Sequence, residues 1–215
     1  MTSRLRLAAA SALLVLLTAC TQTSPVSRPE GSTAPATTPT APVTRAPDSG
    51  DLGDLKRAAG IADCPESDPD VAPAEGGLPD AVLPCLGGGR PVRLAGLRGR
   101  PMIVNVWAQW CAPCRDEAPF LADVASTTRS DVLVLGIDHA DPLPARALEF
   151  AQVAAWTYPQ IQDQDQVLRT DLQVVALPQT VFVRADGTIA YRNLRPFSSA
   201  DQVRELSERY LGVSP

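Results

Sequence analysis

Two cysteines separated by two residues, Cys111 and Cys114, lie where an apolar run meets a segment with helical spacing. The run Met102–Trp107 is almost continuously apolar, as expected for a β-strand that is covered on both faces. After the first cysteine, residues 112–126 repeat alanine and leucine at the spacing of a helix. A chain that delivers a cysteine pair from a buried strand to the start of a helix predicts an α/β fold.

The rest of the pattern predicts one central mixed β-sheet flanked by helices on both faces. A parallel strand pair joined by a helix is followed by an antiparallel hairpin and a terminal helix. In the hairpin, Gly187 can supply the positive φ that the turn requires. Besides the two elements above, we expect strands at 91–94, 132–137, 180–184 and 188–192, and helices at 143–155, 166–171 and 199–210.

Residues 1–19 have the pattern of a secretory signal. Arg4 and Arg6 precede an apolar stretch that ends at Leu17 and is too short to cross a hydrocarbon core of about 30 Å as a helix. The motif Leu-Thr-Ala-Cys that ends at Cys20 resembles the bacterial lipobox, whose cysteine carries acyl chains after cleavage. We therefore expect Cys20 to be a lipid anchor on the extracytoplasmic face of the cell membrane. An ordinary signal, from which Cys20 is discarded, is the alternative.

Composition divides the remaining chain into a tether and a domain. Residues 20–60 are rich in Pro, Thr, Ser and Ala and hold almost no large apolar side chain, so we expect a disordered tether. Residues 61–215 form the predicted folded domain. The formal charge of the chain is -5, and no basic patch stands out. Nucleic acid is therefore not an expected partner.

The chain has five cysteines, an odd number for an exported protein unless one is assigned to lipid. Four then remain, in two pairs. Because thiols outside the cytosol tend to oxidise, we expect Cys64 and Cys85 to form a structural disulfide. Closing a loop of about twenty residues contributes on the order of 3 kcal/mol to stability. A zinc site built from both pairs is the alternative, but the spacing between the pairs is irregular, so we expect no metal.

The position of Cys111 indicates its chemistry. At a helix N-terminus, unpaired backbone N–H groups favour a thiolate, which makes Cys111 the candidate nucleophile. Cys114, one turn further along, is the candidate resolving thiol. Pro113 is tolerated because the first helical turn needs no N–H donor. No His follows Cys114, so the motif is not a haem attachment site.

The segment 106–119, Val-Trp-Ala-Gln-Trp-Cys-Ala-Pro-Cys-Arg-Asp-Glu-Ala-Pro, resembles the active-site segment of the thioredoxin superfamily, and within it the exported TlpA/ResA-like branch. The similarity extends over residues 83–211. Asn105, Glu117 and Pro119 match positions typical of that branch, as does the Leu-Arg-Gly-Arg turn at 97–100. Leu177–Pro178 resembles the family's cis-proline element, whereas by itself Pro178 is equally consistent with a proline that begins a strand.

The resemblance implies an extracytoplasmic thiol-disulfide oxidoreductase without a cofactor. Its partners would be exported proteins with thiols or disulfides, apocytochromes of cytochrome c biogenesis among them, and a membrane redox partner that recycles the pair. Glu117 lies three residues beyond Cys114, where a carboxylate can accept the thiol proton or raise its pKa. The implied substrate groove is formed by Trp110, Ala112, Pro113 and Leu177. The direction of electron flow and the identity of the partners stay open.

Two other functions remain open at this point. A peroxiredoxin-like peroxidase shares the fold, but its motif places Pro and Thr or Ser where this chain has Val104 and Ala108. A copper or haem chaperone on the same scaffold needs a His or Met near the pair, and His139 is the only histidine. We expect His139 to be a surface or capping residue rather than a ligand.

Overall fold

The computed structural model describes residues 49–128, 131–213 and 215. The predicted signal, Cys20 and the tether up to residue 48 lie outside these residues. Within the described part of the chain, no helix has both the length and the apolar character needed to cross a membrane.

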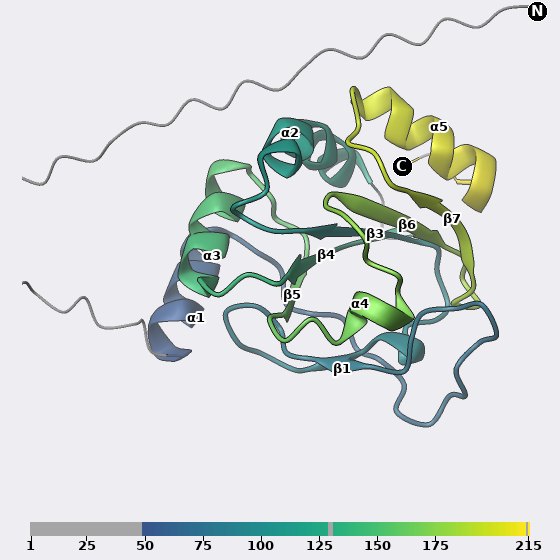
Figure 1. Ribbon diagram of the computed structural model, residues 1–215, viewed down its shortest axis with the longest axis horizontal. Coiled ribbons are helices and arrows are strands. Elements are labelled where there is room, and N and C mark those ends of the chain that lie inside the picture. The colour runs from purple at the N-terminus through teal and green to yellow at the C-terminus, as the bar shows by residue number, and fades with distance from the viewer. Residues whose placement is uncertain (1–48, 129–130, 214) are drawn as a thin grey trace, which may run out of the picture. The chain divides into compact units, whose positions relative to one another are not determined.

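A five-stranded mixed sheet forms the centre of the domain, in the order β5-β4-β3-β6-β7 (Figure 1). The strands are β3 (Met102–Trp107), β4 (Leu133–His139), β5 (Gln160–Asp163), β6 (Gln179–Val183) and β7 (Ile189–Asn193). β4 runs parallel to both β3 and β5, whereas β6 is antiparallel to β3 and β7. Every residue of β3 and β4 is buried, which explains why both read as continuous apolar runs.

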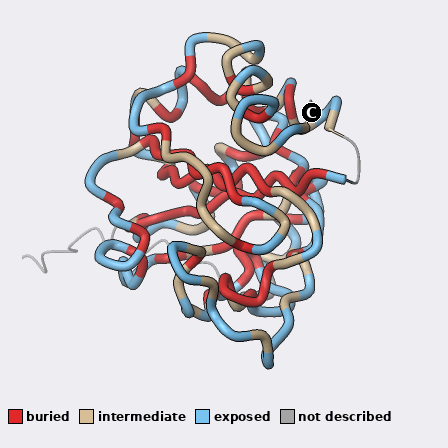
Figure 2. Tube along the Cα trace, turned by 90° about the vertical axis from the view of Figure 1, so that its right-hand side faces the viewer, coloured by how far each residue is buried: buried red, intermediate tan, exposed pale blue. Residues whose placement is uncertain are grey.

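Helices and a small second sheet cover the two faces of this sheet. The core on one face takes side chains from α1 (Ser49–Ala58), α2 (Ala112–Thr127), α3 (Pro144–Val153) and α5 (Ala200–Leu211). The other face is covered by α4 (Leu168–Asp171), a 3-10 helix at Leu94–Gly96, and the antiparallel strands β1 (Val82–Leu83) and β2 (Val92–Arg93). Figure 2 shows the buried residues concentrated between these layers. The predicted fold class is thus confirmed.

Most predicted elements agree with the observed ones to within one or two residues. The helix predicted at 112–126 is α2, and the hairpin turn contains Gly187 at φ 84.

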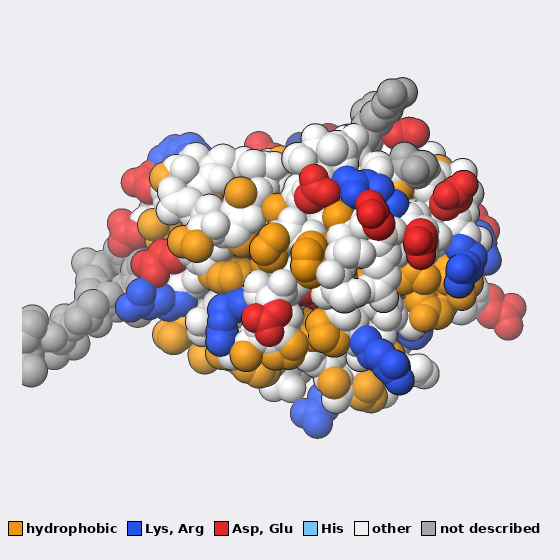
Figure 3. Space-filling model, turned by 90° about the horizontal axis from the view of Figure 1, so that it is seen from above, with side chains coloured by type: hydrophobic (Ala, Val, Ile, Leu, Met, Phe, Trp, Pro, Cys, Tyr) orange, Lys and Arg blue, Asp and Glu red, His pale blue; other side chains and the backbone are white. Residues whose placement is uncertain are grey.

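On the side of the molecule above α2 and α5, hydrophobic side chains form a broad area bordered by both acidic and basic ones (Figure 3).

The structure corrects the sequence prediction at α1. Residues 20–60 were expected to form a tether, yet Ser49–Ala58 is a helix, and the domain therefore begins before residue 61. Leu52 and Leu55 of α1 pack against the core. Two apolar side chains among polar ones are too few to be distinguished from a tether by composition, and this helix depends on tertiary packing.

The sequence prediction also missed β5. Its sequence is Gln-Ile-Gln-Asp, and Ile161 is its only apolar residue. The polar residues at its ends are nevertheless buried, because each has hydrogen-bond partners. Gln160 Oε1 accepts from Trp107 Nε1 at 3.0 Å, and Asp163 Oδ1 accepts from the backbone N–H of Val167 at 2.8 Å. Burial through hydrogen bonds leaves no hydrophobic pattern to read.

An aromatic cluster joins β3 to α3. Trp107 and Trp156 are fully buried and meet edge to face with ring centroids 4.8 Å apart. Phe150 packs at 5.4 Å from Trp107 and 5.3 Å from Trp156. Trp156 Nε1 donates to the carbonyl oxygen of Ala118 at 3.0 Å, which also ties the cluster to α2. Because Trp107 is the last residue of β3, the cluster packs against the end of the strand that leads to Cys111.

Replacing Trp156 with Ala is expected to lower the free energy of unfolding by about 3–5 kcal/mol, because it leaves a cavity and removes the hydrogen bond to the carbonyl of Ala118. Denaturant unfolding of the oxidised protein measures this value. The control is Val153→Ala, since Val153 ends α3 with 86% of its surface exposed; its effect should stay within about 0.5 kcal/mol. Equal effects of the two substitutions would show that the cluster does not stabilise the fold.

Candidate active site

Cys111 and Cys114 form a disulfide at the start of α2, with Cα atoms 5.3 Å apart. Cys111 is the N-cap of the helix, and its Sγ accepts a hydrogen bond from the backbone N–H of Cys114 at 3.2 Å. Pro113 lies in the first turn, where its missing N–H leaves no partner unsatisfied. The sulfur of Cys111 therefore sits at the positive end of the helix dipole, which stabilises a thiolate after reduction.

The two sulfurs differ in their access to solvent. Cys111 retains 4% of its surface exposed, and Cys114 is completely buried. Trp110, immediately before the pair, is 51% exposed and donates from Nε1 to the carbonyl oxygen of Ala140 at 3.3 Å. Ala112 is exposed and Pro113 is half-buried. A partner reaching this surface therefore meets Cys111 before Cys114.

The peptide bond Leu177–Pro178 is cis and lies at the same end of the sheet as the cysteine pair. Gln179, which follows Pro178, is paired across the sheet with Val106, five residues before Cys111. A groove of about 190 Å³ lies beside the Leu177–Pro178 bond, and both Trp110 and Leu177 line it. The structure thus brings together two of the four residues predicted to form a substrate groove, while Ala112 and Pro113 lie at the surface of the first turn of α2.

Glu117 is one turn beyond Cys114 and is only 1% exposed. One carboxylate oxygen accepts from Asn105 Nδ2 at 3.0 Å, and the other accepts from the backbone N–H of Phe197 at 2.9 Å. Burial raises the pKa of the Glu117 carboxyl from an ordinary 4.5 to about 7, although both hydrogen bonds oppose this shift. Its described hydrogen bonds are to Asn105 and Phe197 rather than to Cys114.

Two acidic residues near the pair, Asp138 and Asp141, were not singled out as site residues from the sequence. Asp141 accepts from the backbone N–H groups of Gln109 and Leu143, at 2.9 and 3.0 Å, and so fixes the loop before Cys111. Asp138 is buried, and this burial raises the pKa of its carboxyl well above the usual range, with the charge of Asp141 adding to the effect. A short polar run after an apolar strand is a weak signal, because most such residues are solvated.

His139 is buried, which corrects the expectation of a surface or capping residue. Its Nδ1 lies 2.7 Å from Oδ2 of Asp163 on the neighbouring strand β5. The missed strand explains the error, since only the pairing of β4 with β5 places Asp163 beside His139. Among the residues that the structure describes, no three His, Cys, Asp or Glu side chains are grouped to hold a metal ion.

Cys64 and Cys85 are also joined by a disulfide, with Cα atoms 5.9 Å apart. Both cysteines are buried. The backbone of Cys85 forms an isolated β-bridge with Ile161 of β5. The Cys64–Cys85 disulfide therefore connects the segment after α1 to the edge of the central sheet.

Comparison with known proteins relates the chain to thiol-disulfide exchange proteins. A family model described as the AhpC/TSA family matches residues 76–192. The thiol:disulfide interchange protein DsbE of Pseudomonas fluorescens biotype C is 33% identical over 133 residues, which is 62% of this chain and 73% of that protein. CycY of Rhizobium leguminosarum bv. viciae is 35% identical over 104 residues, which is 47% of this chain and 54% of that protein. The chain therefore spans only about half of CycY.

A solved structure shows the same arrangement of elements. A secreted disulfide oxidoreductase of Mycobacterium tuberculosis, described as homologous to DsbE of Escherichia coli, matches with a TM-score of 0.53 at 30% identity. The match covers 62% of this chain and 96% of that one. Its fold agrees with the fold of this chain, and its description as a disulfide oxidoreductase agrees with the chemistry of the cysteine pair.

Replacing Glu117 with Gln is expected to remove a pH-dependent loss of stability. Because the carboxyl pKa of about 7 in the folded chain exceeds the ordinary 4.5, the folded state holds this proton more tightly than the unfolded state. The Glu117 contribution to stability is thus complete below pH 4.5 and is lost as the pH rises through about 7, by up to about 3 kcal/mol.

Denaturant unfolding at several pH values, with Glu117→Gln compared to the natural chain, measures this difference. The exposed Glu205 on α5 supplies the control, because Glu205→Gln should keep the pH dependence of the natural chain. If Glu117→Gln and the natural chain lose stability in parallel between pH 4.5 and 7.5, the carboxyl does not titrate as described.

Proposed function

The chain belongs to the AhpC/TSA family of thioredoxin-like proteins and is a thiol-disulfide oxidoreductase, and from this premise we propose that it exchanges disulfides with exported proteins outside the cytoplasm. The proposal rests on the position of Cys111 in the structure. Its sulfur caps α2 at the end of the sheet where the cis bond before Pro178 lies, and it is the more exposed of the two.

The proposed reaction proceeds through a mixed disulfide. In the reducing direction the Cys111 thiolate attacks a partner disulfide, and the partner's leaving sulfur departs as a thiolate. Cys114 then attacks Cys111 Sγ, which closes the disulfide and releases the partner's second sulfur. In the oxidising direction the same steps run in reverse. The burial of Cys114 confines its reaction to the neighbouring Cys111 sulfur.

In this proposal Glu117 acts on the resolving thiol. A carboxyl whose pKa lies at about 7 can take up or release a proton near neutral pH, and Glu117 follows Cys114 by one helical turn. As a base it would help Cys114 lose its proton before the second step. The Glu117→Gln chain, in its reduced form, should accordingly show a shifted pH profile for thiol alkylation, whereas Glu205→Gln should not.

Substrate recognition is proposed to use the backbone beside the cis bond. An extended peptide can pair with the exposed backbone before Pro178 while its side chains contact Trp110 and the groove next to Leu177. Ala112 and Pro113 would form the opposite wall, on the first turn of α2. This mode of binding selects for an accessible disulfide or thiol pair in an extended segment, and it suits exported proteins that have not completed folding.

The match to the AhpC/TSA family does not favour a peroxidase. At the two positions where the peroxidase motif places Pro and Thr or Ser, this chain has Val104 and Ala108, and both are fully buried. Neither can donate a hydrogen bond to a peroxide from its side chain.

Trapping experiments test the proposed exchange. A Cys114→Ser chain should accumulate mixed disulfides through Cys111 with exported proteins that carry disulfides, because the resolving step is blocked. Non-reducing gels and mass spectrometry of the isolated complexes identify the partners. Cys111→Ser is the matched control and should trap nothing.

The reduction potential decides the direction of this reaction. A value near about -270 mV against glutathione indicates a reductant, and one near about -120 mV an oxidant.

If Cys114→Ser and Cys111→Ser trap the same proteins at the same level, the Cys111 thiolate is not the nucleophile and the proposal fails.

Cys20 is proposed as the lipid anchor and residues 21–48 as a tether to the domain. Two or three acyl chains at Cys20 suffice for stable membrane attachment. Replacing Cys20 with Ser should therefore move the exported chain from the membrane fraction to the soluble extracytoplasmic fraction, while the activity of the Cys111–Cys114 pair is retained. Fractionation and metabolic labelling with a fatty acid measure both properties. Membrane retention of Cys20→Ser would mean that another feature holds the chain there.

A further inference from the structure

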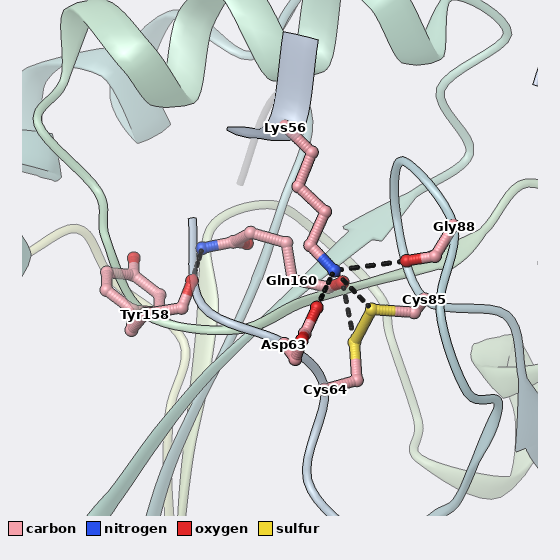
Figure 4. Close-up of a disulfide and its surroundings, with 7 residues drawn as sticks. All are labelled: Lys56, Asp63, Cys64, Cys85, Gly88, Tyr158 and Gln160. Carbon is pink, nitrogen blue, oxygen red and sulfur yellow. Dashed lines mark hydrogen bonds and ion pairs between the residues drawn. A yellow bond between two sulfur atoms is a disulfide. The ribbon is translucent and has the colours of Figure 1, made fainter. Parts of the chain in front are cut away.

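Lys56 is the only lysine in the chain, and it is buried against the Cys64–Cys85 disulfide (Figure 4). Its side chain extends from α1 with 6% of its surface exposed. Nζ lies 3.4 Å from Cys85 Sγ, donates to the carbonyl oxygen of Gly88 at 3.0 Å, and contacts Asp63 Oδ1 at 3.0 Å. The ammonium group of Lys56 is thus in direct contact with one sulfur of the Cys64–Cys85 disulfide.

The charges at this site do not match the oxidised state. A disulfide is uncharged, so its interaction with a buried ammonium group does not offset the free energy of hydration that this group loses. The Asp63 carboxylate is 95% exposed and remains solvated, which makes it a weak partner. A thiolate at Cys85 would supply a buried counter-charge at hydrogen-bond distance. The site therefore suits the reduced form of Cys85.

The loop beside Cys85 is built to receive this lysine. A Cβ at Gly87 would lie 2.8 Å from Lys56 Cβ, so only glycine allows the approach, and its φ of +76 is one that other residues rarely adopt. At Gly89 a Cβ would lie 3.5 Å from Lys56 Nζ and 3.6 Å from Cys85 Sγ. The turn thereby closes around the ammonium group and aims the Gly88 carbonyl at it (Figure 4).

Cys64 Sγ lies 3.3 Å from the carbonyl oxygen of Gln160, but only Cys85 pairs with a strand. Cys85 is bridged to Ile161 of β5, and the next residue, Leu86, donates its N–H to the carbonyl oxygen of Gln160 at 2.9 Å. Cys64 lies in a segment without helix or strand, next to the exposed Asp63. Cys64 is the more exposed of the two, at 6% against 4%, and Cys85 is the one beside Lys56.

We propose that Cys64 and Cys85 form a second redox-active pair, in which Cys64 is the sulfur attacked and Cys85 leaves as a thiolate paired with Lys56. A cation next to the leaving sulfur stabilises it, and a better leaving thiolate speeds thiol-disulfide exchange. The oxidised domain then carries two exchangeable disulfides. The second is separate from Cys111 and Cys114 and does not depend on their function.

The reductant in this step is a dithiol, from a partner protein or added as dithiothreitol. One of its thiols loses a proton to solvent and attacks Cys64 Sγ, and the electron pair of the broken S–S bond goes to Cys85. The second thiol then attacks the mixed disulfide, and its proton ends on Cys64. The dithiol is oxidised to a disulfide, and the protein holds one thiol and one thiolate.

The test uses the full chain with Cys20, Cys111 and Cys114 replaced by Ser, so that the only remaining cysteines are Cys64 and Cys85. Dithiothreitol should reduce the bond in the folded protein, as followed by alkylation and intact mass. Lys56→Met should slow this reduction about tenfold, whereas Lys56→Arg, which keeps the charge, should restore most of the rate. A bond that resists dithiothreitol until the protein unfolds overturns the proposal, as does an equal rate for Lys56→Met and the natural Lys56.

A second measurement needs no substitution at Lys56 and so does not depend on the folding of that variant. Brief exposure to reduced glutathione, followed by N-ethylmaleimide, should place glutathione on Cys64 and the maleimide on Cys85. Cleavage at the acidic residues between the two cysteines separates them for mass spectrometry. Glutathione on Cys85, or equally on both, would overturn the assigned order of attack.

Discussion

The end of β3 and the start of α2 form one rigid junction, and the chemistry of this protein depends on it. β3 is hydrogen-bonded to β4 on one side and β6 on the other, and all its residues are buried. The strand therefore cannot shift without disrupting the sheet. Six residues of strand deliver the chain to Cys111, whose sulfur then caps the helix. A thiolate at this position is stabilised by backbone N–H groups whose positions the sheet has already fixed.

Polar side chains behind this junction link its stability to its function. Asn105 on β3 donates to Glu117 and to Thr180 of β6, and Glu117 accepts from Phe197 beyond β7. Burying the Glu117 carboxyl costs stability when it is ionised, and that same cost places its pKa where proton transfer is possible. A Leu or Met at Glu117 would fill the space, but it would remove the only buried carboxyl group on α2.

The two disulfides of the domain use different sources of positive charge. At Cys111 the source is a helix N-terminus, which is part of the fold and cannot be removed by one substitution. At Cys85 it is the ammonium group of Lys56, supplied by a helix that packs onto the domain from the N-terminal side. α1 is the first helix of the described chain, so the second site takes its charge from the N-terminal end of the domain.

The sequence by itself determined the cysteine pair, the strand and helix around it, the hairpin turn at Gly187 and the resemblance to the thioredoxin superfamily. Each is encoded by residues that are close in the chain, so periodicity and turn residues reveal it. Only the tertiary structure decided α1, β5 and the surroundings of Glu117 and Lys56. Glu117 is 80 residues from Phe197 in the chain, and Lys56 is 29 from Cys85. Contacts between polar residues so far apart follow no local pattern, because the folded sheet alone brings them together.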